Sequence, residues 1–577
     1  MKTWSKRDAL TSIEEVFLRN IGVSSLDEVN GWFKKSYDDK YRIDRLDDAV
    51  FLAYDFIDRP VRIIGDYDGD GVTSTSILKL ALEYVGFKNV SYRIPKRFSE
   101  GFGINTTIID EVDSGLIITC DNGVAQPEAI QKAKDKGLTV IIIDHHEPIV
   151  EEGKNILPPA DVIIDPNAIE GSADFNGYCG AGLSYRFAKK LIAMMPVPRP
   201  DMFTFQKKLL ALAAIGTVAD VMELREENYV FVRNGLKALN SPNESTSGTY
   251  ALASAFSLAG HVTAHDIGFK LGPAINACSR MKDDGAKDAV NLLTFDESYP
   301  KAIPMAETII AVNDARKAAK EKALEVANKV IIDNCLMGDV PLVVKLEDVP
   351  EGVIGIIAGK LCEEYHVPAI VLTRTEDGIL RGSSRSCGNY HMKNNLDKCS
   401  ELLLKYGGHE CAAGLSLLEE NYDRFIEAIQ QTASDFEFEE TAADVVYDLE
   451  IKASDIPDTI KALKKFEPFG NGNAAPVFKV TNYSINPKGG SFVNKVTSSY
   501  DITKLFYKSD VCAIGFDMTN RFEGETPKCV TLVGTLNDNY FGNKVTHQVE
   551  FTDFKVEKLD KVMTPLAEKL SKMAMMS

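Results

Sequence analysis

Three short segments of the sequence group carboxylate and imidazole side chains in patterns that suit a divalent metal ion. They are GDYDGDG at residues 65–71, DNG at 121–123 and DHHE at 144–147. Alternating carboxylates can converge on one ion, and mixed aspartate and histidine ligands favour Mn²⁺ or a similar ion over Ca²⁺. A calcium-binding loop is not expected, because the twelfth position counted from Asp66 is Ile77, where that loop needs glutamate. These segments therefore predict a metal site with Asp and His ligands.

A fourth segment, AAIGTVADVMEL, is apolar apart from a few residues and contains the carboxylate of Asp220. Burying a carboxylate there without a cation or several hydrogen-bond donors would be costly. Each segment alone has a simpler interpretation, because Asp and Gly also form turns and helix caps. The occurrence of all four in one chain favours the metal site.

The elements around these segments predict a parallel β-sheet. From about residue 61, strand-like runs alternate with helix-like stretches, including VRII, TSTSILKLALEYVGF, LIITC, PEAIQKAKDKG and TVIIID. The runs LIITC and TVIIID are continuously apolar, which suits strands covered by helices on both faces. Since ligands of open sheets collect at the carboxyl ends of the strands, we expect Asp66, Asp121 and His145 at one edge of an α/β domain.

The rest of the chain predicts further domains. A long helical pattern without glycine is followed by a second α/β pattern, which an acidic run, DFEFEETAAD, ends near residue 444. Short alternating stretches after it are typical of a small antiparallel β-barrel. The expected parts are an N-terminal helical extension (1–60), a catalytic domain (61–300), a connecting helix (301–333), a second α/β domain (334–444) and the barrel (445–577).

Composition narrows the class of protein. A chain of 577 residues with 45% hydrophobic and 26% charged residues is typical of a soluble protein with several domains. We expect a cytoplasmic protein, because no apolar run suits a membrane-spanning helix and the N-terminus lacks a signal-peptide core. Ten cysteines without a CxxC pair predict reduced thiols. The net charge of -19 argues against a general basic surface, so any path for nucleic acid must be local.

The segments DYDGDG, DNG, DHH and GTVAD, in this order, resemble the successive motifs of the DHH phosphoesterase superfamily. Later segments resemble its RecJ-like exonucleases. They are YCGAGLSYRFA (178–188), LGPAINACSR (271–280), EGVIGIIAGKL (351–361), GSSRS (382–386), YGGHECAAG (406–414) and EPFGNGNAAPVF (467–478). The resemblance covers residues from about 61 to 478. It implies a DHH domain, a DHH-associated domain and an oligonucleotide-binding (OB) fold for the barrel.

The resemblance also implies a set of site residues. Two Mn²⁺ or Mg²⁺ ions would be held by Asp66, Asp68, Asp121, His145 and Asp220. His146 would lie close to the scissile phosphate, and Asp121 would bridge the two ions, whose role is to stabilise the attacking and leaving oxygens.

Five further residues would bind the substrate if the resemblance holds. They are Arg97, Arg280, Ser383, Arg385 and His409. Arginine can bind phosphate through two hydrogen bonds, and Gly-rich turns such as GSSRS and GGHECAAG let backbone amides approach it. Taken alone, such arginines are often surface ion pairs, and such turns are often structural.

The sequence departs from the RecJ pattern at two positions of LGPAINACSR. Ala274 stands where RecJ proteins usually have arginine, and Ser279 stands where they usually have glycine. Both changes leave the implied metal ligands untouched and bear on contacts with the substrate strand.

The barrel segment combines lysines with aromatic rings, as single-strand-binding proteins do. These residues are Lys479, Lys488, Phe492, Lys495, Tyr500, Lys504, Phe506, Tyr507 and Lys508. About half of the rings are expected in the core, since strand residues alternate inward and outward.

The resemblance implies a 5′ to 3′ exonuclease that hydrolyses single-stranded DNA to mononucleotides in DNA repair and recombination. We expect a monomer, with a single-strand-binding protein or a helicase as candidate partners. One alternative is a DHH-type phosphodiesterase acting on short oligoribonucleotides or cyclic dinucleotides, which usually lacks the long helix and the barrel. Another is an inactive scaffold protein, whose signature would be the loss of metal ligands. All five ligand positions are filled here.

Overall fold

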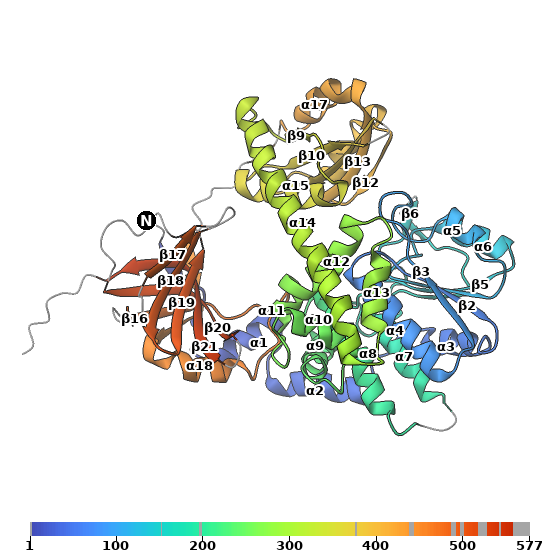
Figure 1. The fold of residues 1–577 in the computed structure, drawn as a ribbon, viewed down its shortest axis with the longest axis horizontal. Coiled ribbons are helices and arrows are strands. Elements are labelled where there is room, and N and C mark those ends of the chain that lie inside the picture. Colours follow the sequence, from blue (N-terminus) through green and yellow to red (C-terminus); the bar gives the residue numbers. More distant parts are fainter. Residues whose placement is uncertain are drawn as a thin grey trace, which may run out of the picture. The chain divides into compact units, whose positions relative to one another are not determined.

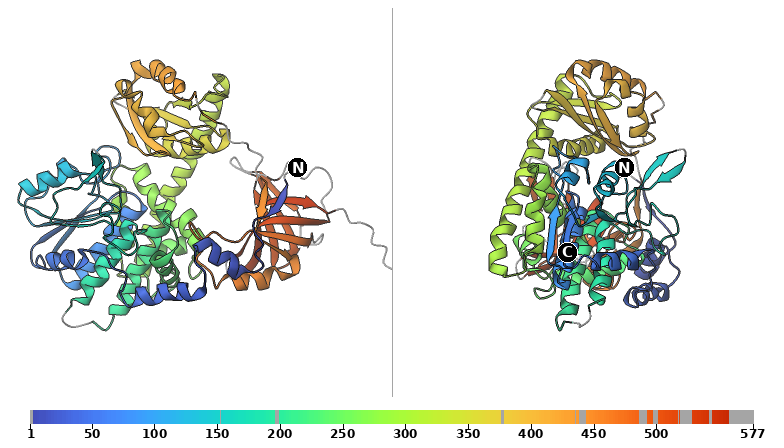
Figure 2. Two further views of the ribbon diagram at one scale, coloured as in Figure 1. Left: turned by 180° about the vertical axis from the view of Figure 1, so that it is seen from behind. Right: turned by 90° about the vertical axis from the view of Figure 1, so that its right-hand side faces the viewer.

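The computed structural model describes residues 3–557 with gaps at 152, 196–198, 376–377, 435, 438–443, 486–491, 497–500, 517, 519–527 and 542–543, and without the side chains of 492–496, 501 and 541. The chain forms two compact units. The larger contains Asp27–Thr441 and Gly470–Gly472, and the smaller contains Met1–Leu26, Ala442–Phe469 and Asn473–Ser577. Figures 1 and 2 show the elements of both units.

The first part of the larger unit is a five-stranded parallel sheet with the order β3-β2-β4-β5-β8. The strands are β2 (Pro60–Ile64), β3 (Asn89–Arg93), β4 (Leu116–Cys120), β5 (Thr139–Ile143) and β8 (Val162–Ile164). Its helices are α3 (Leu46–Tyr54), α4 (Gly69–Val85), α5 (Thr106–Asp110), α6 (Pro127–Asp135) and α7 (Gly180–Ala193). A two-stranded hairpin, β6 (Ile149–Glu151) and β7 (Lys154–Ile156), follows β5.

Successive side chains of these strands enter two different cores. On β4, Ile118 packs in the core that includes α3, α4 and α7, whereas Ile117 packs in the core that includes α5 and α6 (Figure 1). Both faces of the sheet are therefore covered, which confirms what the continuously apolar strands predicted.

A helical part follows the sheet. Its elements are α8 (Met202–Ala219), α9 (Glu226–Leu239), α10 (Ser247–Ala255), α11 (Ala264–Asp266), the π-helical turn η1 (Ile267–Leu271), α12 (Gly272–Met281) and α13 (Ala286–Thr294), together with α2 (Leu26–Tyr37). Among the described helices, only α8 has the length and composition of a membrane span, with a mean hydropathy of 1.2. No such segment was expected from the sequence. In the structure α8 packs against α4, α7 and α9 and buries Leu209 and Leu212 completely, as a core helix does.

The long helix α14 (Tyr299–Asp333) connects two cores. Near its start, Ala302 and Ile309 belong to the core of the first part. Near its end, Ala327 and Ile331 belong to the core of the following domain. This helix therefore has the connecting position that the sequence predicted (Figure 2).

The following domain has a mixed sheet with the order β12-β13-β11-β10-β9. Its strands are β9 (Leu342–Leu346), β10 (Ala369–Arg374), β11 (Ile379–Arg385), β12 (Lys405–Gly408) and β13 (Ala412–Leu418). Its helices are α15 (Glu351–Tyr365), α16 (Met392–Asp397) and α17 (Tyr422–Gln431), with short 3-10 turns η2 (Ser400–Leu402) and η3 (Glu419–Asn421). Only the pair β9 and β10, which α15 connects, is parallel.

The smaller unit contains a seven-stranded sheet with the order β15-β16-β20-β21-β19-β18-β17. The strands are β15 (Leu449–Lys452), β16 (Phe478–Ser484), β17 (Phe492–Val496), β18 (Asp501–Lys508), β19 (Val511–Phe516), β20 (Cys529–Phe541) and β21 (Lys544–Val556), with η4 (Ala453–Asp455) and α18 (Ile456–Leu463). Four of its strand pairs are antiparallel, as the predicted antiparallel barrel requires, whereas β15 and β16 are parallel and so are β19 and β21.

The N-terminal segment is divided between the two units. Strand β1 (Trp4–Lys6) pairs in parallel with β14 (Val445–Tyr447), and Val16 of α1 (Ile13–Ile21) lies in the core of the smaller unit. Helices α2 and α3 belong mainly to the larger unit. The sequence had presented residues 1–60 as one extension.

Candidate metal centre

The described acidic and histidine residues form three overlapping clusters at the carboxyl ends of β2, β4 and β5, which are neighbours in the sheet. Within each cluster, one ligand atom from each residue lies within 4.8 Å of the others. The clusters are Asp66–Asp68–Asp121, Asp121–His145–His146 and Asp70–His145–Asp220. The structure thus brings together all five ligands predicted from the sequence, and adds Asp70 and His146 to the group.

Asp121 occupies the centre of this arrangement. Its φ angle of 61° places it in the left-handed region, which Asp and Asn adopt more often than most other non-glycine residues. This conformation turns the carboxylate toward His145, whose Nε2 lies 3.1 Å from Asp121 Oδ1. The next residue, Asn122, is fully buried and donates to the backbone oxygens of Ile64 and Cys120. Asn122 therefore ties the ends of β2 and β4 together beside the site.

The turn between β2 and α4 places three carboxylates. Asp68 caps α4 and accepts hydrogen bonds of 3.0 Å from the amides of Asp70 and Gly71. Asp70 is buried, and its two oxygens accept from the amides of Gly180 at 2.6 Å and Ala181 at 2.9 Å. These amides belong to the first turn of α7, whose positive dipole end favours a carboxylate.

The first turn of α7 lies very close to the carboxylates. A Cβ placed on Gly180 would lie 2.7 Å from the Cβ of Asp121 and 2.9 Å from Oδ2 of Asp70. Only glycine permits this approach.

Asp144 orients the second histidine of the DHH segment. It is buried, and its Oδ1 lies 2.8 Å from Nδ1 of His146, while its Oδ2 accepts from the amide of Val124. The ring of His146 also contacts Phe102 edge-on, with 5.2 Å between ring centroids. With Nδ1 held by Asp144, the imidazole presents Nε2 away from the β5 turn.

Asp220 reaches the site from the end of α8. Its Oδ2 lies 3.7 Å from Nε2 of His145. The loop that follows is held by Asn471, whose side chain donates to the oxygen of Val221 and whose backbone oxygen accepts from the amide of Leu224, both at 2.7 Å.

Electrostatics of the site favour a bound cation. Burial, together with the charge of Asp68, raises the pKa of Asp66 well above its usual value. Burial and the charges of Asp70, Asp68 and Asp66 do the same to the pKa of Asp121. Burial and neighbouring carboxylates raise the pKa of Asp220 to about 8. A divalent cation would relieve this repulsion, and a donor set of carboxylate oxygens with imidazole nitrogen fits Mn²⁺ or Mg²⁺.

Asp70 and Asp144 belong to the segments from which the sequence predicts a metal site, but not to the five ligands that the resemblance implies. The signal for Asp70 was present, because three carboxylates alternate between a strand and a helix. Its contact with α7 could not be read from that pattern, because Gly180 is far along the chain. Asp144 acts through His146, so no ligand pattern would reveal it.

Two of the predicted substrate-binding arginines flank the metal turn. The guanidinium of Arg97 stacks over the ring of Tyr67, with 4.5 Å from Cζ to the centroid, and donates to Ser279 Oγ at 3.4 Å. Arg280 donates to the backbone oxygen of Gly352 at 3.3 Å. Burial and the charges of Arg97, Arg316 and Arg385 lower the pKa of Arg280 to about 10.

The second domain places Ser383 and Arg385 together. Nη1 of Arg385 lies 3.4 Å from Ser383 Oγ, and a Cβ on Gly355 of α15 would lie 2.9 Å from the same oxygen. His409 lies at the same end of the sheet as Arg385, because its amide donates to the oxygen of Ala412, which is paired with Arg385 in the register of β11 and β13. It is exposed in the turn between β12 and β13, and the described residues include no side-chain partner for it.

Comparisons with known proteins agree with this architecture. Residues 60–217 match the DHH family N-terminal domain, 339–435 match the DHHA1 domain, and 447–553 match the RecJ OB domain. The chain is 32% identical over 437 residues to the single-stranded-DNA-specific exonuclease RecJ of Haemophilus influenzae, covering 72% of this chain and 74% of that protein. The chain belongs to the RecJ family.

Further RecJ proteins extend the similarity. The RecJ exonuclease of Bacillus subtilis is 31% identical over 508 residues, covering 86% of this chain and 61% of that protein. The crystal structure of RecJ from Thermus thermophilus in complex with Mn²⁺ has a TM-score of 0.70 and 25% identity, covering 92% of this chain and 75% of that one. Another structure of exonuclease RecJ bound to manganese has a TM-score of 0.58 and 28% identity, covering 70% of this chain and 98% of that one.

The two departures from the RecJ pattern have different surroundings. Ala274 is completely buried in the main core, so this position holds no substrate contact here. Ser279 is also buried, and its hydroxyl is the hydrogen-bond partner of Arg97. The serine thus orients an arginine that the RecJ resemblance assigns to the substrate.

The RecJ OB domain presents part of the predicted lysine and aromatic mixture. Lys504 and Phe506 share one face of β18, with Lys504 Nζ 5.3 Å from the Phe506 centroid, whereas Tyr507 packs against the core. Lys508 is exposed, and Lys479 pairs with Glu450. Lys488 and Tyr500 lie outside the described residues, as do the side chains of Phe492 and Lys495.

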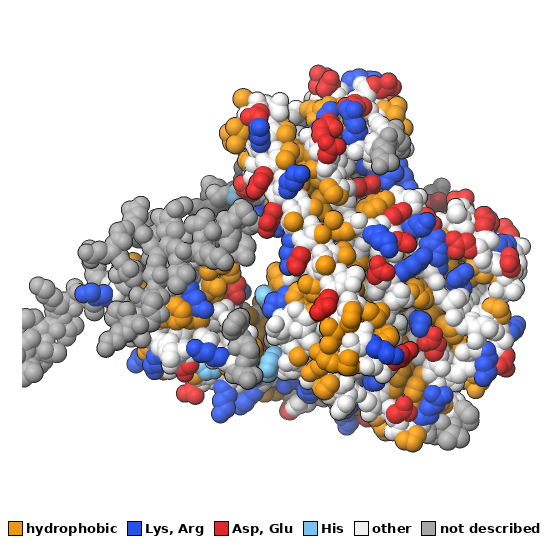
Figure 3. Space-filling view, in the orientation of Figure 1, with side chains coloured by type: hydrophobic (Ala, Val, Ile, Leu, Met, Phe, Trp, Pro, Cys, Tyr) orange, Lys and Arg blue, Asp and Glu red, His pale blue; other side chains and the backbone are white. Residues whose placement is uncertain are grey.

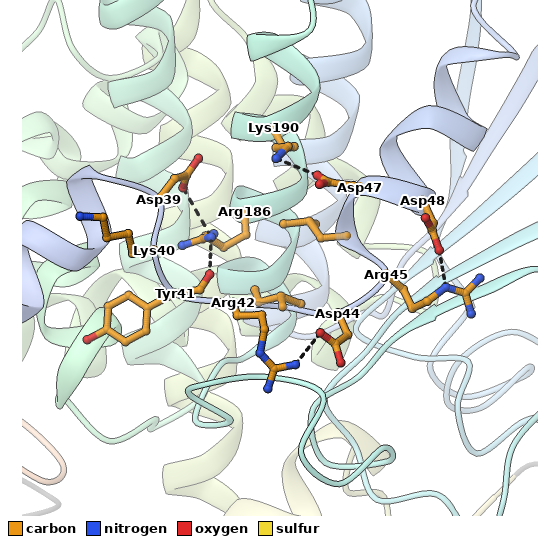
Figure 4. Close-up of a pocket in the computed structure, with 12 residues that line it drawn as sticks. Asp39, Lys40, Tyr41, Arg42, Asp44, Arg45, Asp47, Asp48, Arg186 and Lys190 are labelled. Carbon is orange, nitrogen blue, oxygen red and sulfur yellow. Dashed lines mark hydrogen bonds and ion pairs between the residues drawn. The ribbon is translucent and has the colours of Figure 1, made fainter.

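A cavity of about 440 Å³ is separate from the metal centre (Figure 4). It lies between residues 39–48 and α7, and several of the basic side chains that line it form ion pairs with acidic side chains of the same lining. Arg42 pairs with Asp44, Arg45 with Asp48, and Lys190 with Asp47. This pairing leaves little charge for a ligand, so the cavity is not a candidate active site.

Proposed function

We propose that this chain is a metal-dependent exonuclease that degrades single-stranded DNA from the 5′ end to mononucleotides, with a role in DNA repair and recombination. The observation that carries the proposal is the convergence of carboxylates and His145 at the ends of β2, β4 and β5 in a chain of the RecJ family. Degradation of strands with a nuclease-resistant linkage at one end tests the polarity. A resistant 5′ end should protect the strand, and protection by a resistant 3′ end alone would contradict the proposal.

Asp66, Asp68, Asp121, His145 and Asp220 would hold two divalent ions, Mn²⁺ or Mg²⁺. Two such ions supply an activated water and stabilise the attacking and leaving oxygens. Asp70 is a sixth candidate ligand, although its first role is to accept the α7 amides. Asp121 would be the carboxylate shared by the two ions, since among the carboxylates of the three clusters it is the one that belongs to two of them.

His146 would bind the scissile phosphate. Its Nδ1 is held by Asp144, so Nε2 remains for a phosphate oxygen. A histidine whose second ring nitrogen is hydrogen-bonded to a carboxylate, which fixes the orientation of the ring, is common in metal sites.

Arg97, Arg280, Ser383, Arg385 and His409 would bind the strand, mainly through its phosphates. Acidic and basic side chains are interspersed on the face of the larger unit drawn in Figure 3, so the binding path is local rather than a broad basic surface. Positive charge is nevertheless concentrated at the arginines, which together lower the pKa of Arg280.

Binding of single-stranded DNA should weaken with salt. Each phosphate contact on a single strand contributes about -0.7 to the slope of log K against log salt, so three arginines predict a slope of about -2 or steeper. Arg385→Gln should make the slope shallower by about 0.7, as measured by fluorescence anisotropy without divalent ions. Arg374→Gln is the control, because Arg374 lies in the same domain and pairs with Glu419. A slope near zero for the unchanged protein would contradict this prediction.

Replacing Lys504 and Phe506 by alanine should weaken binding of long strands by about tenfold or more, because each stacked base contributes roughly 1–3 kcal/mol. Hydrolysis of a very short oligonucleotide should change by less than about twofold, since the metal centre lies in another domain. These substitutions are preferable to deletion of the barrel, which would leave β1 without β14 and remove Asn471. Lys452→Ala on the edge strand β15 is the control. Equal losses on long and short substrates would show that the barrel is part of the catalytic architecture.

We also propose that the protein is a monomer and that it acts in the cytoplasm, where chromosomal DNA is accessible. A single-strand-binding protein or a helicase would be a suitable partner, since either supplies the substrate as a free strand.

A further inference from the structure

Two cysteine side chains contact each other in the DHHA1 domain. Cys362 is buried on α15, and Cys387 is half-buried, two residues after the end of β11. The two thiols form a hydrogen bond, and Cys387 packs against the core cluster that contains Cys362. Both are reduced in the structure, and the proposed chemistry of the metal centre uses neither of them.

The contact follows from the way in which α15 lies along β11. A Cβ on Gly355 would lie 3.5 Å from Nη2 of Arg385, and a Cβ on Gly359 would lie 3.8 Å from Cγ of the same arginine. Cys362 is three residues after Gly359 on the helix, and Cys387 is two residues after Arg385, so each stays on the face of its predecessor. The two thiols are therefore the next facing pair along the same helix and strand.

The two thiols line a cavity that opens to the surface. Its volume is about 210 Å³, and its lining also includes Glu363, His366 and Gly388, all of which are exposed. A small solute such as hydrogen peroxide can therefore reach the pair. Cys387 is the more exposed of the two thiols, so it meets such a solute first.

We propose that Cys362 and Cys387 form a redox modification site, at which hydrogen peroxide produces a disulfide that weakens binding of the DNA strand. The sulfur of Cys387 attacks the peroxide and breaks its O–O bond, which leaves a sulfenic acid on Cys387 and releases one water. The sulfur of Cys362 then attacks the sulfenic sulfur to form the S–S bond, and the departing hydroxide takes the proton of Cys362 as a second water. The two electrons that the thiols lose reduce the peroxide to two waters.

The environment of Cys362 suits the second step rather than the first. Burial and the neighbouring Cys387 raise the pKa of Cys362 to about 12, so this thiol is protonated at neutral pH. A buried, protonated thiol is inert toward solutes. It can still react with a sulfenic acid that is already in contact with it.

The disulfide would act on the strand through Arg385. A disulfide holds its sulfurs about 2.0 Å apart, closer than a hydrogen bond between thiols does, so the end of β11 would be drawn toward α15. The side chain of Arg385 lies along that helix and would be displaced. This effect on binding rests on the proposed function, whereas formation of the disulfide does not.

The test treats the full chain with hydrogen peroxide in EDTA and then removes the excess peroxide. Peptide mapping without reduction identifies the linked cysteines, and fluorescence anisotropy measures binding of a labelled single strand before oxidation, after it, and after dithiothreitol. Cys387→Ser removes the first thiol, and Cys362→Ala removes the second. Cys335→Ser is the matched control, because Cys335 is an exposed thiol just after α14.

Oxidation of the unchanged protein should link Cys362 to Cys387 and weaken binding about tenfold, as expected when one hydrogen-bonded contact to a charged group is displaced. Dithiothreitol should restore binding. Oxidised Cys335→Ser should behave like the unchanged protein, whereas Cys387→Ser and Cys362→Ala should keep their binding after oxidation. If thermal melts show that Cys362→Ala is unfolded, Cys387→Ser decides this comparison.

Several results would overturn the inference. They are the absence of a link between the two cysteines, a link from Cys387 to the exposed Cys411 instead, a link that leaves binding unchanged, and an equal loss of binding in oxidised Cys387→Ser. If the reduced, unchanged protein does not bind single-stranded DNA, the proposed function fails and the effect on binding with it. Peptide mapping still decides in that case whether the disulfide forms.

Discussion

Asp121→Asn should lower the rate of single-strand cleavage by at least about 10³-fold while leaving the protein folded. The substitution keeps the shape of the side chain and suits the left-handed backbone at φ 61°, so the geometry of the turn is preserved. It removes the negative charge that belongs to two of the three ligand clusters. Turnover of a labelled oligonucleotide with saturating Mn²⁺ measures the effect, and calorimetric titration with Mn²⁺ should show weaker binding.

The same variant should be at least as stable as the unchanged protein when metal ions are absent. Burial and neighbouring carboxylates raise the pKa of Asp121, so its negative charge is unfavourable without a cation. A neutral amide removes that repulsion, and the melting temperature in EDTA should stay the same or rise. Asp113→Asn, at an exposed position before β4, is the control for both measurements. Near-normal cleavage by Asp121→Asn would contradict the assignment of the metal centre.

Asp70→Asn should lower both activity and stability. Both oxygens of Asp70 accept backbone amides of α7, whereas asparagine has one acceptor oxygen and would direct its NH₂ group at a donor. A buried donor left unpaired costs about 1–3 kcal/mol, which corresponds to a fall of several degrees in melting temperature. Cleavage should fall by about 10²-fold or more, because α7 would shift beside Asp121.

The contrast between the two aspartates is the informative result. Melting in EDTA should separate them, with Asp121→Asn unchanged or stabilised and Asp70→Asn destabilised. If Asp70→Asn melts like the unchanged protein, the contact with α7 does not support the fold. If it is also fully active, Asp70 has no part in the site.

Much of the metal centre could be predicted because its ligands follow apolar strands. LIITC and TVIII are buried on both faces, and parallel strands deliver their following residues to one edge, so Asp121 and His145 had to lie close together. Asp220 was harder to place, since it ends a helix rather than a strand. Its interpretation depended on the cost of burying a carboxylate and on the resemblance to DHH proteins.

Contacts between distant segments could not be predicted in the same way. The amides that bind Asp70 come from Gly180 and Ala181, and no local pattern links them. The helical pattern of residues 301–333 showed a long polar-faced helix, but not which cores its two ends would join. Likewise, alternation predicts strands without stating their partners, so the parallel pairs of the barrel and the pairing of β1 with β14 were not foreseen.

Digestion of labelled nucleic acids tests the central claim most directly. Single-stranded and double-stranded DNA and RNA, labelled at one end, are incubated with the full chain and Mn²⁺, Mg²⁺ or EDTA. The account predicts that single-stranded DNA is degraded to mononucleotides with Mn²⁺ or Mg²⁺, that EDTA abolishes this activity, and that duplex DNA and RNA persist much longer. Degradation in EDTA, or faster degradation of RNA than of single-stranded DNA, would contradict it.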